Sequence, residues 1–254
     1  MNDAVRSEPI TYTCREIQRA WWKKISIHKP GVDALSGTCL LMVLMHLFIE
    51  LTGGFYAHQS IYDQWLGLKS ESLLEGKVWQ LVSYSFLHGN WFHLFTNIAM
   101  IWLIGGRLMR ILNQKKVAIS LLLGSVVGGL FFVGFDLWCG QESFLVGSSG
   151  SAFALFILMA CLSPNAKMFP IPVRAKNMAV GILAASLILC LAHPGLNLPF
   201  FRTITEWLDR YQMSSVFRVA HACHLGGGLA GLWLSSRIMG RMVSLDDLKR
   251  SRIH

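Results

Sequence analysis

The chain has 254 residues, of which 53% are hydrophobic and 15% are charged. Because soluble domains usually carry about 25% charged residues, this composition argues against a large soluble core and indicates a membrane protein with several spanning segments. The formal net charge of +9 could indicate nucleic-acid binding, but the basic residues are distributed as the orientation of a membrane protein requires, and we expect no nucleic-acid partner.

Six apolar segments are candidates for helices that cross a hydrocarbon layer of about 30 Å. They cover residues 34–54, 91–108, 117–138, 149–163, 177–193 and 221–240. We therefore predict an all-α fold, a polytopic bundle of six transmembrane helices over residues 34–240. Residues 1–33 would form a short cytoplasmic N-terminal tail, since they lack the apolar stretch of a cleaved signal peptide, and residues 241–254 a cytoplasmic C-terminal tail. Four or five spans remain the alternative, because the fourth and fifth segments are short and the sixth contains two histidines.

The basic residues set the predicted orientation. With both ends of the chain in the cytoplasm, all but five of the 23 lysines and arginines fall on the cytoplasmic side. The five on the outer side are Lys69, Lys77, Arg202, Arg210 and Arg218. Such a bias follows the positive-inside rule. We expect a multi-pass protein of a bacterial plasma membrane, embedded in the lipid bilayer.

Two of the predicted outer connections are long. Residues 55–90 are rich in tyrosine, tryptophan and phenylalanine, which predicts a segment lying at the membrane interface. Residues 194–220 contain two prolines and the pair Phe200–Phe201, and this connection could form a flexible cover.

Four polar residues inside the predicted spans are functional candidates, because polar groups in a membrane interior are costly. They are His93 and Asn97 on the second span, Ser149 at the start of the fourth and His224 on the sixth. At 1.5 Å per helical residue, His93, Ser149 and His224 each lie about 20 Å from the cytoplasmic end of their helix. Three separate spans therefore place polar groups in one layer.

The chemistry of these residue types indicates a serine nucleophile. A serine hydroxyl becomes reactive when an adjacent base accepts its proton, and His224 is the natural base. Ser149 opens a helix, so unpaired N–H groups and the positive end of the helix dipole lie beside a developing oxyanion. His93 and Asn97 are four residues apart on one helical face and could donate to the same oxygen. Because the sixth span has no carboxylate to orient His224, we predict a dyad and not a triad.

Each candidate also has a structural interpretation. The "GSSG" stretch could serve close helix packing alone. His221 and His224 could be half of a metal site, but nothing completes it, and the six cysteines are scattered without CxxC spacing. We expect no metal and no cofactor. We interpret His46 and Glu50 on the first span as a structural pair, because no nucleophile accompanies them.

Taken together, the motifs resemble the rhomboid family of intramembrane serine proteases. The matching pieces are "HGNWFHLFTN" (88–97), "GSSG" (147–150) and "AHACHLGGGLAG" (220–231). The resemblance covers the six-span core, roughly residues 34–240. The combination of pieces is specific, although each piece alone is not.

The resemblance implies roles for five residues. Ser149 would be the nucleophile and His224 its general base. His93, Asn97 and the backbone N–H groups of Ser148 and Ser149 would form the oxyanion site.

Further residues would support the site. Phe153 would pack an aromatic ring on the catalytic histidine, and His88 would be structural. Gly226, Gly227 and Gly231 would let the sixth helix approach the fourth. Ser148 and Ser151 would have no catalytic side chain, and His221 could line a water-filled cavity. The remaining supporting residues are the motif glycines Gly147 and Gly150.

One position departs from the family pattern. Many members carry Trp-Arg in the first loop, where this chain has Trp79-Gln80, so the resemblance supplies no arginine to anchor that loop here. The expected function is hydrolysis of peptide bonds in or beside transmembrane segments of substrate proteins, near the outer face of the membrane. The alternatives are a binding or trafficking protein of the inactive-rhomboid kind and a histidine-based membrane transporter. The sequence predicts no oligomeric state.

Overall fold

The computed structural model describes residues 31, 33–53, 62, 64–168, 172–211 and 220–239. Except for Gly31 and Asp33, the two predicted tails lie outside the described residues.

Each of the six predicted apolar segments forms a helix. The helices are α2 (Ala34–Leu51), α6 (Trp91–Met109), α7 (Gln114–Cys139), α8 (Ser149–Leu162), α9 (Ala175–Leu191) and α11 (His221–Met239). Three of them begin after an N-cap residue whose side chain accepts a hydrogen bond from the first turn. These bonds satisfy backbone N–H groups that have no partner within the helix. These N-caps are Asp33 for α2, Asn90 for α6 and Asn113 for α7.

Shorter elements connect these helices. They are β1 (Leu68–Lys69), α4 (Ser70–Leu74), α5 (Gln80–Ser83), η1 (Tyr84–Phe86), β2 (Phe144–Leu145), β3 (Lys167–Met168), β4 (Val173–Arg174), η2 (Pro194–Leu196) and α10 (Pro199–Arg210). The strands form two small antiparallel pairs, β1 with β2 and β3 with β4. The connection predicted as a flexible cover thus contains a helix, α10, and its residues 212–219 lie outside the described part of the chain.

By length and composition, α2, α6 and α7 are the described helices able to cross a membrane, while α8 and α9 are shorter apolar helices. The helix α11 is 19 residues long but contains two histidines and Arg237. The helical architecture is confirmed, and the six-span count and the orientation stay predictions.

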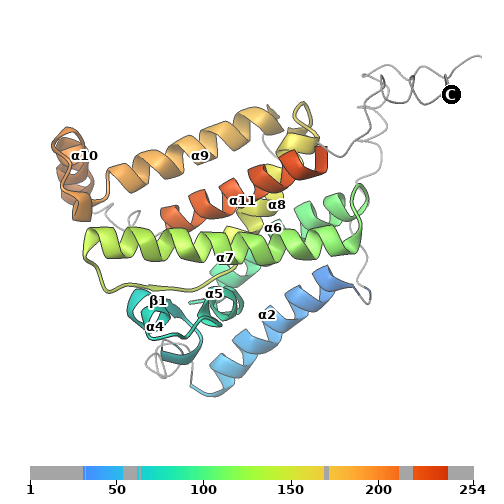
Figure 1. The fold of residues 1–254 in the computed structure, drawn as a ribbon, viewed down its shortest axis with the longest axis horizontal. Coiled ribbons are helices and arrows are strands. Elements are labelled where there is room, and N and C mark those ends of the chain that lie inside the picture. The colour runs from blue at the N-terminus through green and yellow to red at the C-terminus, as the bar shows by residue number, and fades with distance from the viewer. Residues whose placement is uncertain are drawn as a thin grey trace, which may run out of the picture.

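The helices lie roughly side by side, with α7, α8 and α11 in extensive mutual contact (Figure 1). The helix α8 is central, since every residue from Ala154 to Ala160 is buried. On α2, α6 and α7, by contrast, large apolar side chains such as Leu44, Phe95 and Leu122 are exposed on the outside of the bundle. Helices that carry apolar side chains both in the interior of the bundle and on its outer surface are typical of proteins surrounded by lipid.

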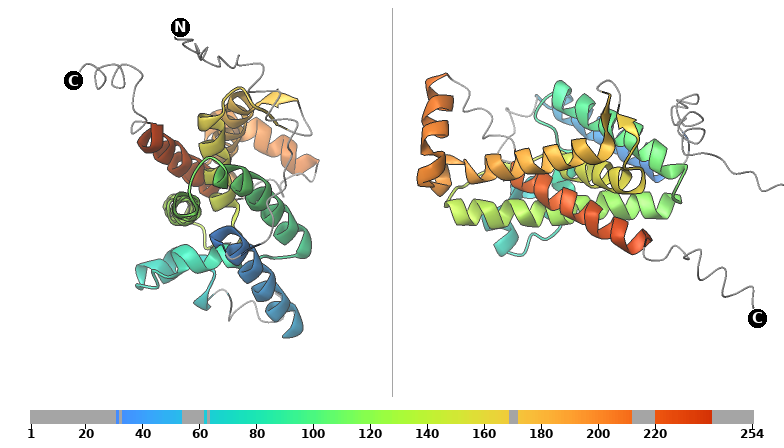
Figure 2. Two further views of the ribbon diagram at one scale, coloured as in Figure 1. Left: turned by 90° about the vertical axis from the view of Figure 1, so that its right-hand side faces the viewer. Right: turned by 90° about the horizontal axis from the view of Figure 1, so that it is seen from above.

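Figure 2 shows the bundle from two further sides, and in these views, as in Figure 1, α10 crosses the end of the bundle. It lies at the end where α7 and α9 finish and α11 begins. The chain then runs back from the end of α7, so that α8 begins nearer the middle of the bundle (Figure 1).

The first loop is anchored by Gln80, the residue that departs from the family pattern. Its side chain is fully buried. The amide Nε2 donates to the carbonyl of Gln64 over 3.0 Å, and Oε1 accepts from the backbone N–H of Lys69 over 3.3 Å. The indole of Trp79 donates to the carbonyl of Trp65. Polar side chains therefore hold this loop together without an arginine.

The loop is also tied to α7. The hydroxyl of Tyr84 donates to the carbonyl of Ser125 over 2.8 Å, and the hydroxyl of Ser125 donates to the carbonyl of Leu81 over 2.9 Å. Near the end of α7, the buried carboxylate of Asp136 accepts from the hydroxyls of Ser70 and Ser143. Since buried polar groups are costly without partners, these paired groups fix the loop against the helix.

Glycines bring α11 against α8. A Cβ added to Gly227 would overlap the carbonyl oxygen of Gly150, and one added to Gly231 would overlap the carbonyl oxygen of Ala154. Both close approaches were predicted. The prediction for Gly226 is wrong, because this residue faces α7, with the carbonyl oxygen of Val127 2.6 Å from a Cβ built there.

We expect Gly227→Ala to destabilise the protein, because the methyl group would meet backbone that cannot move without separating α8 from α11. Forced overpacking of this kind costs typically about 1–3 kcal/mol. Gly134→Ala on α7 is the matched control, since a Cβ there has nothing within 4 Å and alanine favours a helix over glycine. Unfolding of both variants in detergent micelles checks the expectation, and equal stability of the two would contradict it.

Candidate active site

Ser149 and His224 lie next to each other, although they belong to separate helices. Ser149 is the first residue of α8 and His224 lies in the first turn of α11. Their side chains form a hydrogen bond in which Oγ of Ser149 is 2.9 Å from Nε2 of His224. Both residues are half-buried. The contact joins a hydroxyl to a potential proton acceptor at the end of the bundle where α11 begins.

Phe153 lies one helical turn after Ser149 and covers the imidazole of His224. The two rings are stacked with centroids 4.2 Å apart and an interplanar angle of 7°. The ring therefore packs on the imidazole in the manner that the resemblance implies. The stacked ring restricts the rotation of the imidazole while its edge remains bonded to Ser149.

His221 lies edge-to-face with His224, with ring centroids 6.0 Å apart. Among the described residues, no group of three or more histidine, cysteine, aspartate or glutamate side chains is placed to hold a metal ion.

His93 and Asn97 of α6 converge on the loop just before Ser149. A Cβ built on Gly147 would lie 2.6 Å from Nε2 of His93 and 3.7 Å from Nδ2 of Asn97. Gly147 also has a φ of +108°, a region that side chains other than hydrogen disfavour. Glycine is therefore required here twice, by conformation and by the approach of His93. Asn97 is buried, and its amide donates to the carbonyl of His93 over 2.9 Å.

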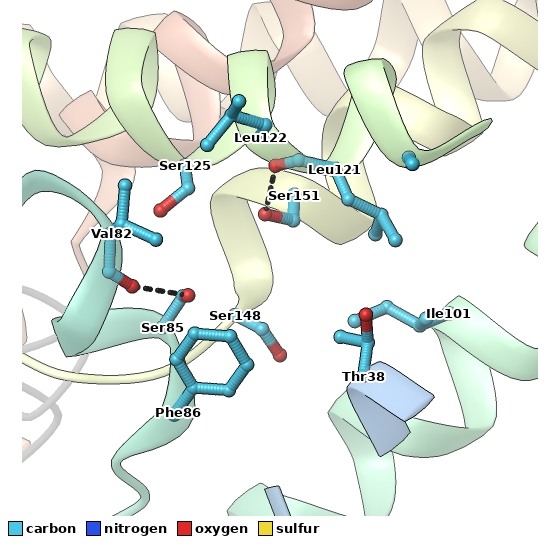
Figure 3. Close-up of a pocket in the computed structure, with 11 residues that line it drawn as sticks. Thr38, Val82, Ser85, Phe86, Ile101, Leu121, Leu122, Ser125, Ser148 and Ser151 are labelled. Atoms are coloured by element: carbon cyan, nitrogen blue, oxygen red, sulfur yellow. Dashed lines mark hydrogen bonds between the residues drawn. The ribbon is translucent and has the colours of Figure 1, made fainter. Parts of the chain in front are cut away.

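Ser148 directs its hydroxyl away from this site. Its Oγ is buried and has no hydrogen-bond partner among the described residues. Figure 3 shows it turned into a cavity of about 140 Å³ that lies between α2, the α5–η1 segment, α6, α7 and α8. Ser151 lines the same cavity and donates to the carbonyl of Leu121 over 2.6 Å. Of the three neighbouring serines, only Ser149 is bonded to His224.

Two further histidines lie near His93. His88 is fully buried just before α6, with its ring centroid 5.1 Å from that of His93. His46 of α2 is also fully buried and lies edge-on to the indole of Trp91, at 4.5 Å. Nε2 of His46 is 3.9 Å from Oε1 of Glu50. The sequence indicated the pair with Glu50, but not the contact of His46 with the start of α6.

Two other contacts of the site were not predicted. Cys223, next to His224, is fully buried, and its Sγ would lie 2.9 Å from a Cβ built on Gly150. Tyr84 of η1 contacts the same sulfur, with 3.6 Å between its hydroxyl and Sγ. Gly150 is therefore needed for the fit of α8 against α11.

Burial, with the neighbouring imidazole of His93 as a smaller cause, lowers the pKa of His88 from 6.5 to about 3. The unfolded chain therefore binds more protons than the folded chain between pH 6.5 and 3. We expect the free energy of unfolding to fall as the pH is lowered through this range, by up to about 1.4 kcal/mol per pH unit from this residue.

The measurement is denaturant unfolding in micelles at pH 7 and pH 4.5 for the wild type and His88→Gln. The variant should lose less stability on acidification than the wild type. An identical loss in both would show that His88 does not titrate in this way. His254, in the predicted C-terminal tail, provides the control variant His254→Gln, which should behave as the wild type.

Comparison with known proteins agrees with this architecture. The family model described as Rhomboid domain matches residues 75–241, well over half of the chain. The chain is 25% identical to human Rhomboid-related protein 3 over 226 residues, which are 87% of this chain and 52% of that protein. It is 24% identical to Rhomboid protease GlpG of Photorhabdus laumondii and 22% identical to that of Yersinia pestis, each over 77% of this chain.

The chain spans between 52% and 59% of the length of these three relatives. The match nevertheless includes every helix from α6 to α11. The helices that contribute Ser149, His224, His93 and Asn97 all fall within it. With its apolar helices, this integral membrane protein belongs to the rhomboid family.

Proposed function

We propose that this protein is an intramembrane serine endopeptidase that hydrolyses peptide bonds in or next to transmembrane segments of other proteins. The observation that carries the proposal is the hydrogen bond between Oγ of Ser149 and Nε2 of His224, at the start of a helix. Two of the relatives are named proteases, which supports the same activity. No cofactor enters the proposed reaction.

In the first step, Oγ of Ser149 attacks the scissile carbonyl carbon while Nε2 of neutral His224 accepts its proton. A serine hydroxyl needs such a base to act as a nucleophile. The stacked ring of Phe153 keeps the imidazole in place. The product of this step is a tetrahedral intermediate with a negatively charged oxygen and a protonated imidazole.

The backbone N–H groups of Ser148 and Ser149 would stabilise the oxyanion, together with His93 and Asn97. The first N–H groups of a helix have no partner within it and lie at the positive end of its dipole. Preorganised donors of this kind usually make the largest contribution to acyl transfer. Gly147 lets the two side chains of α6 approach the loop that carries these groups.

In the second half of the reaction, the protonated His224 donates its proton to the leaving amine as the C–N bond breaks. The remaining acyl-serine is an ester. Water then attacks the ester carbonyl, with His224 accepting the proton, and the C–O bond to Ser149 breaks as the imidazole returns that proton to Oγ. The enzyme is regenerated and a carboxyl product is released.

The substrate class follows from the location of the site in an integral membrane protein. A helical substrate backbone is already hydrogen-bonded, so the segment must unwind before its carbonyl can meet Ser149. We propose six spans with both termini in the cytoplasm of a bacterium, a domain at 34–240 and tails on either side. The site would then open towards the extracytoplasmic face, since α8 and α11 start at that end.

We expect Ser149→Ala and His224→Ala each to abolish cleavage of a transmembrane substrate in proteoliposomes. Both should also lose labelling by a fluorophosphonate, which reacts with activated serine hydroxyls and needs no knowledge of the natural substrate. Removing a member of a nucleophile–base pair costs most of the rate, because the remaining residue cannot act alone. Mass spectrometry of the wild type should locate the label on Ser149.

Ser151→Ala is the matched control, because its hydroxyl is bonded to the carbonyl of Leu121 and is turned away from His224. This variant should retain labelling and cleavage. Hydrolysis that persists in Ser149→Ala would contradict the assignment of Ser149 as the nucleophile. Loss of activity with a chelator would favour a histidine-based metal or transport function. A folded wild type that neither cleaves nor labels would favour a binding protein of the inactive-rhomboid kind.

We expect Asn97→Ala and His93→Ala to lower kcat by about 10²–10³ fold each, the range for loss of one oxyanion donor. The KM should change little, because the donors act on charge that develops in the transition state. Thr96→Ala is the control on the same helix, since Thr96 is exposed and bonds only to backbone carbonyls one turn earlier. A rise in KM with unchanged kcat would assign the two residues to substrate binding instead.

A further inference from the structure

The helix α10 has an apolar side and a polar side. At 3.6 residues per turn, Phe200, Trp207 and Tyr211 fall on one narrow stripe, the last of them directly after the helix. Arg202, Glu206 and Arg210 are spaced four residues apart on the other side. Arg202 and Glu206 form an exposed ion pair, with 3.0 Å between Nε and Oε1. Such separation is typical of a helix at a boundary between two media.

Among the described side chains of α10, the ones that contact the protein lie along one edge of the helix. Leu208 is 9% exposed, and it lies roughly a quarter turn away from the stripe of Phe200 and Trp207. Thr205 lies beyond it on the same edge, and its hydroxyl donates to the carbonyl of Ala192 over 3.1 Å. The contact with the end of α9 therefore uses neither the aromatic stripe nor the charged side.

The three side chains of the aromatic stripe are exposed. Phe200 is 82% exposed, Trp207 51% and Tyr211 60%. The rings of Trp207 and Tyr211 contact each other, with centroids 4.8 Å apart. Large aromatic side chains that project from one side of a helix are costly in water, while tryptophan and tyrosine are favoured at the level of lipid headgroups.

The position of α10 determines which medium covers the stripe. The helix begins eight residues after α9 ends and crosses the end of the bundle in all three views (Figures 1 and 2). On α9 itself, Val180, Leu187 and Ile188 are exposed, as is expected of side chains that face lipid. A helix that follows such a segment so closely and turns across its end (Figures 1 and 2) is placed to lie along the membrane surface.

We propose that α10 is an interfacial helix whose aromatic stripe inserts into the headgroup and upper acyl region of the bilayer that holds α9. Its charged side would face water. The helix contains two arginines and two acidic residues, so its formal charge is zero. Insertion would therefore depend on apolar burial and not on anionic lipids. This inference rests on the membrane location of the protein and is independent of its proposed protease activity.

Anchoring of α10 would also fix the outer end of α9. The bond from Thr205 joins α10 to Ala192, the residue directly after that helix. The turn η2 between them contacts α7, where His193 lies edge-on to Phe135 at 5.4 Å. Apart from these connections, α9 packs chiefly against α8 and α11. Lipid contact at α10 would thus restrict how far α9 can tilt.

The test measures depth in proteoliposomes of the full chain. The variants are made in a cysteine-free background that has the same melting temperature as the wild type. A spin label is attached to the stripe in Phe200→Cys, Trp207→Cys and Tyr211→Cys. Arg202→Cys and Glu206→Cys carry it on the charged side as matched controls. Collision rates with oxygen, which concentrates in lipid, and with a water-soluble nickel chelate are compared in vesicles of phosphatidylcholine alone and of equal parts phosphatidylcholine and phosphatidylglycerol.

We expect the ratio of oxygen to nickel collisions to be severalfold higher at the three stripe positions than at the two control positions, in both kinds of vesicle. Free access of nickel to the stripe would overturn the proposal, and so would a stripe shielded from both probes, which would indicate cover by a second copy or another protein. A ratio that requires phosphatidylglycerol would overturn insertion by apolar burial.

A second measurement keeps the native cysteines. The difference in fluorescence between the wild type and Trp207→Phe isolates the emission of Trp207. Lipids brominated in the upper acyl chain should quench this emission and aqueous iodide should not. The reverse pattern would place Trp207 in water and overturn the proposal, whatever the outcome of the cleavage assays.

Discussion

The close approach of α8 and α11 is the constraint on which the candidate site depends. Because Gly227 and Gly231 have no side chains, the backbone of α11 can contact the carbonyls of Gly150 and Ala154. In a membrane, close packing of this kind replaces the hydrophobic effect as the force that holds helices together. The same contact sets the distance between Ser149 and His224, so packing and chemistry share one interface.

The remaining parts of the site are held by polar groups that are paired inside the protein. The loop before α6 is fixed by Gln80 and Tyr84, and the latter also touches Cys223 beside His224. Because an unpaired polar group in a low-dielectric interior costs free energy, few other conformations of this loop would keep these groups paired. Among the described residues, Ser149 is hydrogen-bonded to the imidazole of His224 and the ring of Phe153 is stacked on it, and these two contacts orient the imidazole.

The fold has a closely packed side and a more exposed side. Helices α7, α8 and α11 contact one another extensively, while α9 lies at the edge and continues into α10. In the proposed reaction, a substrate helix would have to reach Ser149 from within the bilayer. Aromatic contact of α10 with lipid would make the membrane itself part of the structure at this edge.

The sequence by itself determined the six helices and the four polar residues on them, because the length of an apolar run and the cost of polar groups in lipid are local properties. It also indicated Gly227, Gly231 and Phe153 through a family resemblance. Tertiary structure alone decided three other features. They are the position of Gly226 against α7, the hydroxyl of Ser148 turned into a cavity and the contact of His46 with Trp91. Each depends on the rotation of one helix about its axis against another, and that rotation is fixed by contacts between residues far apart in the chain.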